Sequence, residues 1–505
     1  MDQLSPALIA TIILGYFFLL IAISFFTSRN TTDSTFFTGD RSSPWLLVAI
    51  GMIGASLSGV TFISVPGLVG AGGKNQAFSY MQMVIGYLFG YAAIAYVLMP
   101  IYYRLGLTSI YEYLGRRLGR HSHWVGAFYF LLSRIVGASF RLFLVAIVLQ
   151  KFLMDSYGIP FEVTVLITIG LIWVYTFSGG IKTIVVTDVL QTVCMLVAVV
   201  LTILHVGRAL ELDFSGIVTT LMESPMTKVW HTDVGWNDPN NIWKQLLSGA
   251  LIALVMTGLD QDMMQKNLTC RSLGDAQKNM VTFSIVLVFA NLLFLSLGAL
   301  LYIYAAESGV DVPASTDLLY PTIALDHMPV VVGVVFLLGL IAAAYSSADS
   351  ALTSLTTAFC IDFLDFGKKD RSLNSKKRIR LLVHIGFSLI LLLVVVVTKQ
   401  LDAKAIINEL FVAAGYTYGP MLGLFAYGIL TRWQLADRYV IPVCIAAPVL
   451  SYILVENSAT WLGGFQFGHT IIALNGLLTF IGLLAITRWG QPPIANIFTN
   501  TRTDG

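Results

Sequence analysis

A polar stripe within a long apolar segment could hold a small cation. Four small residues recur in it at intervals of three and four positions, namely Ala343, Ser346, Ser347 and Ser350. In a helix this spacing places them on one face, and Asp349 borders the same face. Hydroxyl, carbonyl and carboxylate oxygens are the ligands that hard cations prefer. Close helix packing also favours serine and alanine, but it gives no role to an acid within a membrane, so the stripe predicts a cation site.

A second acid lies inside another apolar segment. Asp188 follows the start of the segment 181–206 by about two helical turns. The rise per residue of a helix places Asp188 and the polar stripe at similar depths, so the two could share one site. A structural acid near the membrane interface is the alternative interpretation of Asp188.

Two apolar segments are interrupted by glycine and polar residues. The segment 44–71 contains GMIGASLSG at 51–59, and the segment 242–266 contains MTGLDQD at 256–262. Interrupted helices in corresponding positions of two inverted halves are typical of transporter sites, because unwinding frees backbone groups to bind ions and solutes. Glycine that merely allows close helix approach is the alternative.

Two arginines, Arg134 and Arg141, lie seven residues apart within one apolar segment. They therefore share nearly the same helix face, and an arginine inside a membrane indicates a functional site by default. The alternative is internal pairing with Asp260, Asp262 or Asp349.

The composition predicts a polytopic membrane protein that positions these residues. The 505 residues have a mean hydropathy of +0.79 and only 11% charged residues, against about 25% in soluble domains. Apolar runs long enough to span a bilayer recur about thirteen times. The expected spans are approximately 5–26, 44–71, 76–103, 122–153, 160–178, 181–206, 242–266, 278–306, 329–364, 375–398, 403–430, 438–455 and 467–488.

The charge pattern predicts the orientation of the chain. Most Lys and Arg residues fall in the connections that are cytoplasmic if the N-terminus lies outside and the C-terminus inside the cell membrane. The longest polar connection, 207–241, is then an outer lid or interfacial helix. No basic tract suits nucleic acid, and no nucleophile–base pair or zinc motif suggests an enzyme. We expect the lipid bilayer and a small solute as partners and a functional monomer.

Five motifs in order resemble the solute:sodium symporter family. They are STFFTGDR at 34–41 followed by Pro44 and Trp45, Gly179 and Gly180 with TDVLQ at 187–191, the segment 260–266, AAAYSSADS at 342–350, and GYTYGP at 415–420. The resemblance implies an all-α LeuT-type fold in one domain, 1–505, with a 5+5 inverted repeat. Its halves would be 44–206 and 242–430, flanked by a leading helix at 5–26 and two additional helices at 438–488.

The resemblance also implies a sodium-coupled symporter that works by alternating access. Sodium is the only metal ion that it implies. The principal sodium site would use backbone carbonyls and hydroxyls, namely those of Gly54, Leu57, Ala343, Ser346 and Ser347. Some members have a second sodium site, which here would use Asp188, Ser346, Asp349 and Ser350. Coupling to protons is the alternative, although hydroxyl and carbonyl ligands favour sodium.

The family resemblance supports the solute-binding residues less fully than it supports the sodium ligands. The candidate solute-binding residues are Ser56, Ser58, Thr61, Gln82, Arg141 and Asp260, of which the resemblance implies the first four. The run LSGVTFISVP at 57–66 is similar to the branch that transports sialic acid, a sugar with a carboxylate. That branch has an arginine whose counterpart falls near Gly137, and Arg141 lies one turn further along. A neutral sugar, an amino acid or a vitamin is the alternative solute.

Overall fold

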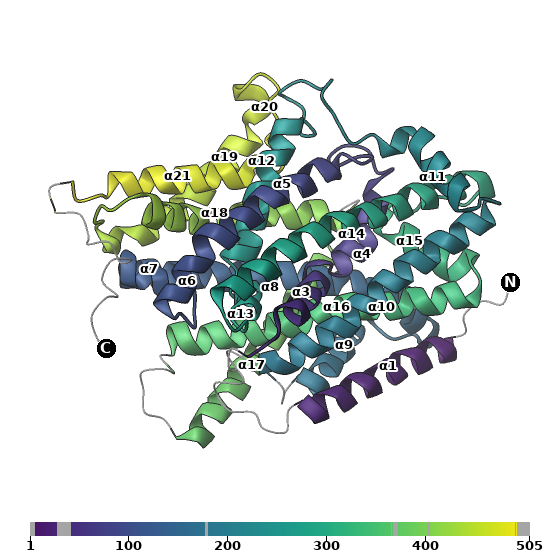
Figure 1. Cartoon of the computed structure of the whole chain (residues 1–505), viewed down its shortest axis with the longest axis horizontal. Coiled ribbons are helices and arrows are strands. Elements are labelled where there is room, and N and C mark those ends of the chain that lie inside the picture. Colours follow the sequence, from purple (N-terminus) through teal and green to yellow (C-terminus); the bar gives the residue numbers. More distant parts are fainter. Residues whose placement is uncertain are drawn as a thin grey trace.

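The computed structural model describes residues 6–27, 42–176, 180–364, 366, 372–400, 405–489 and 491. This part of the chain is helical, with isolated bridges only between Ser43 and Cys270 and between Leu435 and Thr487 (Figure 1). The predicted motif at 34–41 and Gly179 lie outside the described residues.

The helices follow the apolar segments of the sequence. They are α1 (Pro6–Thr27), α3 (Trp45–Ser56), α4 (Gly59–Leu68), α5 (Tyr80–Ala93), α6 (Met99–Leu105), α7 (Glu112–Arg117), α8 (Arg120–Leu149), α9 (Phe161–Thr176), α10 (Gly180–Ala209), α11 (Phe214–Glu223), α12 (Ile242–Ala253), α13 (Gln261–Asn267), α14 (Leu273–Ser308), α15 (Leu319–Thr322), α16 (Val330–Ala358), α17 (Leu373–Thr398), α18 (Ile406–Leu430), α19 (Val440–Glu456), α20 (Ser458–Trp461) and α21 (Ile471–Ala485). Short π or 3₁₀ turns are η2 (Ile94–Leu98), η3 (Gln150–Met154), η4 (Asp155–Tyr157), η5 (Pro225–Thr227), η6 (Leu254–Gly258), η7 (Thr316–Leu318), η8 (Ile323–His327), η9 (Phe359–Phe363), η10 (Asp437–Tyr439) and η11 (Gly468–Thr470).

Each predicted span coincides with a helix or a bent pair of helices. By length and composition, 8 helices of the described part could cross a membrane, or up to 10 if each of two bent pairs counts as one span. The apolar stretches of α1 and α9, Ala7–Ile23 and Phe161–Trp173, are shorter. The predicted membrane character and all-α fold are confirmed, whereas the count of thirteen spans stays a prediction.

Helix α16 forms the centre of the molecule. It contacts α10, α8, α3 and α4, and these helices lie around it in Figure 1. Small residues permit this packing: a Cβ atom added at Gly339 would lie 2.7 Å from the side chains of Ala198 and Phe62. The predicted polar stripe is therefore enclosed by protein, and its serines and Asp349 are all buried.

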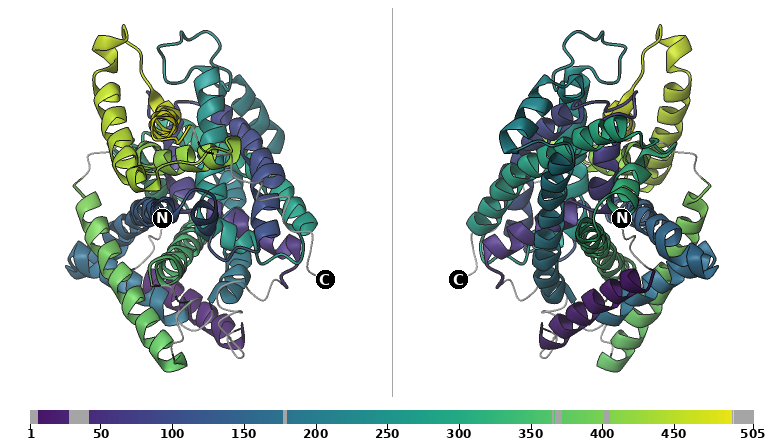
Figure 2. Two further views of the ribbon diagram at one scale, coloured as in Figure 1. Left: turned by 90° about the vertical axis from the view of Figure 1, so that its left-hand side faces the viewer. Right: turned by 90° about the vertical axis from the view of Figure 1, so that its right-hand side faces the viewer.

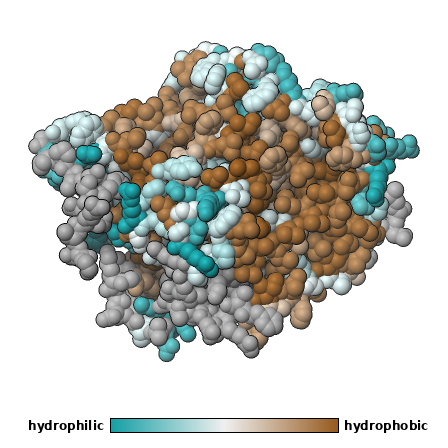
Figure 3. Space-filling model, in the orientation of Figure 1, coloured by the Kyte–Doolittle hydropathy of each residue, from teal (hydrophilic) through white to brown (hydrophobic). Residues whose placement is uncertain are grey.

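The periphery is apolar. Phe18, Phe89 and Leu393 have exposed fractions of 76%, 65% and 63%. Apolar side chains spread over most of the face seen in Figure 3, and α1 and α17 lie at the opposite edge from α19 in both views of Figure 2. Such a surface is far larger than the apolar patches of soluble monomers and suits a hydrocarbon environment.

Candidate functional site

Two bent helix pairs bring backbone groups into the protein interior. Helix α3 meets α4 at an angle of 55°, and the segment Ile242–Gly258 meets α13 at 70°. Each break interrupts the ladder of hydrogen bonds and leaves carbonyl groups at the end of one helix and N–H groups at the start of the next. The two interrupted segments predicted from the sequence are thus broken helices.

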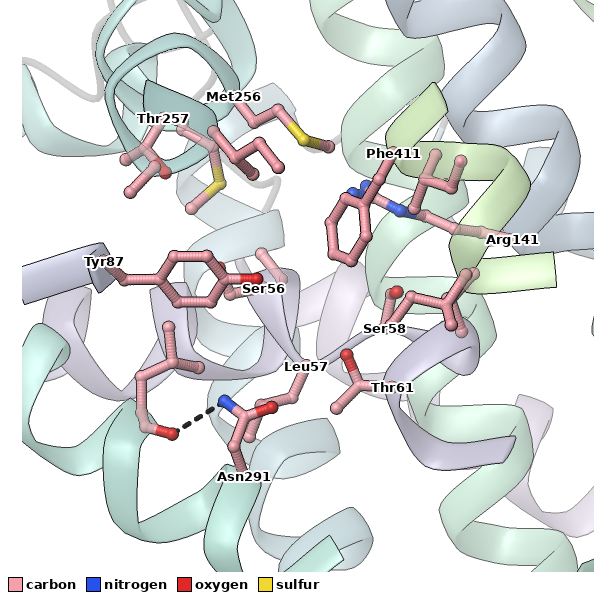
Figure 4. Close-up of a pocket in the computed structure, with 18 of the residues that line it drawn as sticks. Ser56, Leu57, Ser58, Thr61, Tyr87, Arg141, Met256, Thr257, Asn291 and Phe411 are labelled. Atoms are coloured by element: carbon pink, nitrogen blue, oxygen red, sulfur yellow. Dashed lines mark hydrogen bonds between the residues drawn. The ribbon is translucent and has the colours of Figure 1, made fainter. Parts of the chain in front are cut away.

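A cavity lies beside both breaks. Its walls come from the α3–α4 junction, α5, α8, the end of α12 with η6, α14 and the start of α18. Figure 4 shows Ser58 and Thr61 on one side of this space, Tyr87 and Thr257 on another, and the guanidinium of Arg141 close to Phe411.

Four of the six predicted solute-binding residues line the cavity. They are Ser56, Ser58, Thr61 and Arg141. The hydroxyl groups come from the α3–α4 junction: Ser56 is the last residue of α3, Ser58 directly precedes α4, and Thr61 lies in the first turn of α4. Gln82 and Asp260 do not belong to the lining.

Gln82 instead anchors the polar connection that precedes α12. Its side-chain carbonyl accepts a hydrogen bond from the backbone N–H of His231 at 3.3 Å. Its amide group donates to the carbonyl oxygen of Asn240 at 3.1 Å. The connection predicted to be a lid is therefore attached to α5 through Gln82.

Asp260 fixes the second break. Its carboxylate accepts hydrogen bonds from the backbone N–H of Asp262 at 2.9 Å and from the hydroxyl of Tyr418 at 2.6 Å. It therefore caps α13 and ties that helix to α18. In this structure Asp260 positions the walls of the cavity without lining it.

The two arginines of α8 have different surroundings. Arg134 forms a buried ion pair with Asp262. Arg141 is also buried and lines the cavity, and within the described part of the chain it forms no ion pair. The sequence left internal pairing open for both residues, and the structure shows it for Arg134 alone.

Several lining residues were missed by the sequence interpretation. They are Tyr80, Tyr87, Tyr91, Thr257, Asn291 and Phe411. The hydroxyl groups of Tyr80 and Tyr87 are 3.0 Å apart, and the ring of Tyr80 stacks on Phe411 with centroids 6.2 Å apart. The three tyrosines share one face of α5, and this spacing could have indicated a binding site. An aromatic face in an apolar segment, however, indicates helix packing as readily as a binding site.

The predicted principal sodium site lies where α16 passes the first break. The hydroxyl of Ser347 is buried and has no hydrogen-bond partner in the described residues. Ser346 donates to the carboxylate of Asp188 at 2.6 Å. A Cβ atom added at Gly59 would lie 4.0 Å from the backbone of Ala344, so α4 and α16 are in close contact there. A buried hydroxyl without a partner is available as a ligand for a cation.

The predicted second sodium site contains a lysine. The ammonium of Lys266 lies 2.7 Å from the carboxylate of Asp188, and both side chains are at most 1% exposed. Lys266 is the last residue of the expected span 242–266, where the charge pattern places it among the cytoplasmic Lys and Arg residues. The structure buries it, because α13 turns inward after the 70° bend.

Gly54 packs α3 against α10. A Cβ atom there would lie 2.2 Å from the hydroxyl of Thr192 and 3.1 Å from the carbonyl oxygen of Asp188. That hydroxyl also hydrogen-bonds two backbone carbonyl oxygens, that of Asp188 in α10 at 2.7 Å and that of Ile50 in α3 at 2.9 Å. The predicted ligand Gly54 therefore has no room for a side chain.

We expect Gly54→Ala to destabilise the folded protein by about 1–3 kcal/mol through overpacking. Thermal unfolding in detergent measures the change. Without the Thr192 hydroxyl, the nearest side-chain atom to the added Cβ would be the Cβ of residue 192, at 3.3 Å. The double variant Gly54→Ala with Thr192→Ala should therefore recover part of the lost stability. Gly170→Ala is the control, since nothing lies within 4 Å of its added Cβ. Equal stability of the Gly54 and Gly170 variants would contradict this packing.

Asp317 links two elements that border the cavity. Its carboxylate accepts hydrogen bonds from the hydroxyl of Ser64 in α4 at 2.6 Å and from the backbone N–H of Ile406 in α18 at 2.9 Å. Burial raises the pKa of Asp317 to about 6, although both hydrogen bonds lower it. The folded protein therefore favours the protonated carboxyl more than the unfolded chain does.

The raised pKa predicts a pH dependence of stability. Between the ordinary pKa of 3.8 and about 6 the folded state binds more protons at Asp317, so stability should fall as the pH rises through 6. Thermal unfolding of the wild type and Asp317→Asn between pH 5 and pH 7.5 tests this, because asparagine cannot titrate. The wild type should gain stability relative to the variant towards pH 5, and parallel pH profiles would disprove the assignment.

Comparison with known proteins agrees with this architecture. The chain is 25% identical over 471 residues to the sodium/sialic acid symporter SiaT of Proteus mirabilis (strain HI4320), with 90% of this chain and 91% of that protein covered. It is 26% identical over 420 residues to the human sodium/iodide cotransporter, covering 79% of this chain and 61% of that protein. A solved outward-open structure of a Na⁺-coupled sialic acid symporter shares the fold, with a TM-score of 0.80, 21% identity and coverage of 96% of this chain and 98% of that chain.

A family model covers most of the chain. The model of the Sodium:solute symporter family matches residues 36–438. The match includes both broken helices, the cavity and the polar stripe of α16. The family, fold and sodium coupling predicted from the sequence are confirmed, and this chain belongs to the sodium:solute symporter family.

Proposed function

We propose that this symporter transports a small solute that bears a carboxylate, of the sialic acid class. The observation that carries the proposal is Arg141, a buried guanidinium that lines the cavity without an ion pair in the described residues. A buried charge requires a partner, and a planar guanidinium binds a carboxylate through two parallel hydrogen bonds. Two relatives that are each 25% identical to this chain, the sodium/sialic acid symporters SiaT of Proteus mirabilis and NanT of Aliivibrio fischeri, support the same class of solute.

The other walls of the cavity suit the remainder of such a molecule. Ser58 and Thr61 offer hydroxyl groups, and Asn291 offers a side-chain carbonyl, since its amide group already donates to Leu287 at 2.8 Å. Tyr87 and Phe411 provide ring surfaces against which the face of a sugar ring can pack. Charge recognition at one end and hydroxyl recognition at the other would orient the solute.

Sodium would bind at the α3–α16 contact. The proposed ligands are the carbonyls of Gly54, Leu57 and Ala343 and the hydroxyls of Ser346 and Ser347. An ion there joins the broken helix of the first proposed repeat, 44–206, to α16 of the second, 242–430. Because the same break carries Ser58 and Thr61, sodium would organise the solute site as it binds, which is the coupling that symport requires.

We propose that the protein lies in the cell membrane as a functional monomer with its N-terminus outside and its C-terminus in the cytoplasm. Arg104 near the end of α6, Arg116 near the end of α7 and Arg120 at the start of α8 support this orientation. All three belong to the connection between the expected spans 76–103 and 122–153, which would be cytoplasmic. Because Lys266 is buried, it no longer counts as a cytoplasmic charge, but the excess of Lys and Arg residues on the cytoplasmic side remains.

Uptake into proteoliposomes tests the function. Radiolabelled N-acetylneuraminic acid should accumulate when sodium is present outside and should fail to accumulate when choline replaces sodium on both sides. A neutral hexose, an amino acid and a vitamin serve as alternative solutes. Uptake that is unchanged in choline but follows an imposed proton gradient would reject sodium coupling in favour of proton coupling.

We expect Ser347→Ala to raise the sodium half-saturation concentration about tenfold, because it removes one ligand worth about 1–3 kcal/mol while keeping the helix. Sodium-dependent uptake measures it. Ser354→Ala is the matched control: this serine is also buried in α16, but its hydroxyl already donates to Ala351 at 3.0 Å. If both variants keep the wild-type sodium dependence, the stripe serves helix packing.

A further inference from the structure

A lysine side chain lies where the family resemblance places a second sodium ion. Lys266 comes from α13, and Asp188 from α10, and both elements contact α16 at the centre of the molecule (Figure 1). The ammonium of Lys266 is 2.7 Å from one carboxylate oxygen of Asp188. Both side chains are inaccessible to solvent, with exposed fractions of 1% and 0%.

The ion pair occupies the Asp188 carboxylate, which is the central ligand of the predicted second sodium site. The other carboxylate oxygen of Asp188 accepts the hydrogen bond from Ser346 at 2.6 Å. Asp349, a further predicted ligand, also attracts the charge of Lys266, as does Asp262. The ammonium therefore lies in the field of three carboxylates and already neutralises part of their charge.

A sodium ion at the same carboxylate would meet strong repulsion. It would have to approach Asp188 within a few ångströms of the ammonium, in an interior where charges are weakly screened. Displacing Lys266 instead would leave a buried ammonium without its partner, which proteins avoid. The donor set that the resemblance implies for a second sodium ion therefore does not fit this chain.

We propose that the Lys266 ammonium is the permanent cation of this position, so that the protein binds and transports a single sodium ion per solute. The inference rests on the proposed sodium-coupled function and makes Lys266 the residue that sets its stoichiometry. A lysine cannot leave with the solute, so α10, α13 and α16 stay tied through every step of the cycle. Only the ion at the α3–α16 contact is then released to the cytoplasm.

The proposal has a consequence for the charge that is moved. One sodium ion together with a monoanionic solute carries no net charge across the membrane, whereas two sodium ions would carry one positive charge. Uptake of N-acetylneuraminate should therefore be insensitive to an imposed membrane potential. A Lys266→Met variant that binds a second sodium ion should become sensitive to it.

Equilibrium binding of ²²Na⁺ to the purified full chain tests the stoichiometry directly. The wild type should bind one sodium ion with a Hill coefficient near one, and Lys266→Arg, which keeps the charge, should do the same. Lys266→Met exposes the carboxylates of Asp188 and Asp349 and should bind two. In Lys266→Met combined with Asp188→Asn, the lost carboxylate should return the number to one.

Three results would overturn the inference. Two sodium ions bound to the wild type would show that the ammonium and a second ion coexist. A folded Lys266→Met variant that still binds one would show that the position is not a cation site. If that variant does not fold, the wild-type number and its response to membrane potential decide. No sodium bound to the wild type would overturn the proposed function itself, and this inference with it.

Discussion

Replacing Arg141 by lysine is expected to raise the half-saturation concentration of a carboxylate-bearing solute at least tenfold, about 1.4 kcal/mol. Lysine keeps the charge but presents it as a single ammonium, so it cannot reproduce two parallel hydrogen bonds to a carboxylate. Arg141→Met removes the charge as well and should lose saturable uptake. Initial rates of N-acetylneuraminate uptake at saturating sodium measure both effects.

The sodium dependence separates a role in solute binding from a structural one. Arg141 lines the cavity from α8, while the proposed sodium ligands lie on α3 and α16, so the sodium half-saturation of Arg141→Lys should stay near that of the wild type. Arg438→Lys, on the exposed turn before α19, controls for the loss of a guanidinium. A neutral sugar as solute, or normal uptake by Arg141→Lys, would contradict the assignment and leave Ser58 and Thr61 as the solute contacts.

The sequence predicts those features that follow from periodicity and from the cost of polar groups in lipid. Three such features are visible in short stretches of the sequence. They are the polar face of α16, the glycine-rich breaks of the two bent helix pairs, and the acids that lie inside apolar segments. Ser347 illustrates this well: its position was expected from its spacing relative to Ala343, and the structure shows its hydroxyl buried and unsatisfied. The family motifs add the order of the elements and the identity of the coupling ion.

Other features depend on contacts between distant segments and leave no such pattern. Lys266 follows the second break and ends an expected span, so from the sequence alone it could lie at the membrane surface. The 70° bend before α13 directs it towards Asp188 in the interior. Gln82 lies in a position that suits a solute contact, but the fold of the connection at 228–241 recruits it to hold His231 and Asn240. The sequence also does not show which arginine pairs with an acid, because Arg134 and Arg141 lie on the same side of α8.

The ion pair between Arg134 and Asp262 gives the second large expected effect. Both side chains are buried, with exposed fractions of 5% and 2%. Asp262→Ala leaves the guanidinium without its partner and should destabilise the protein by about 3–5 kcal/mol, the range seen when one member of a buried pair is removed. Thermal unfolding in detergent, with and without solute, measures this loss.

Removing both charges should cost much less. Arg134→Met combined with Asp262→Leu replaces the pair by apolar side chains of similar size, and such replacements are often neutral or stabilising. Recovery of stability in the double variant would show that the single variant fails because of an unpaired charge and not because of lost packing. Equal stability of Asp262→Ala and the wild type would show that the pair contributes little.

The same variants test why only one arginine faces the cavity unpaired. Arg134 also reaches the lining, from the same helix as Arg141. With Asp262 present, the guanidinium of Arg134 is neutralised and Arg141 alone remains for the solute. In Asp262→Ala both would be free, so a carboxylate solute should stabilise this variant by a larger increment than it stabilises the wild type. An equal increment in the two proteins would place Arg134 outside the reach of the bound solute.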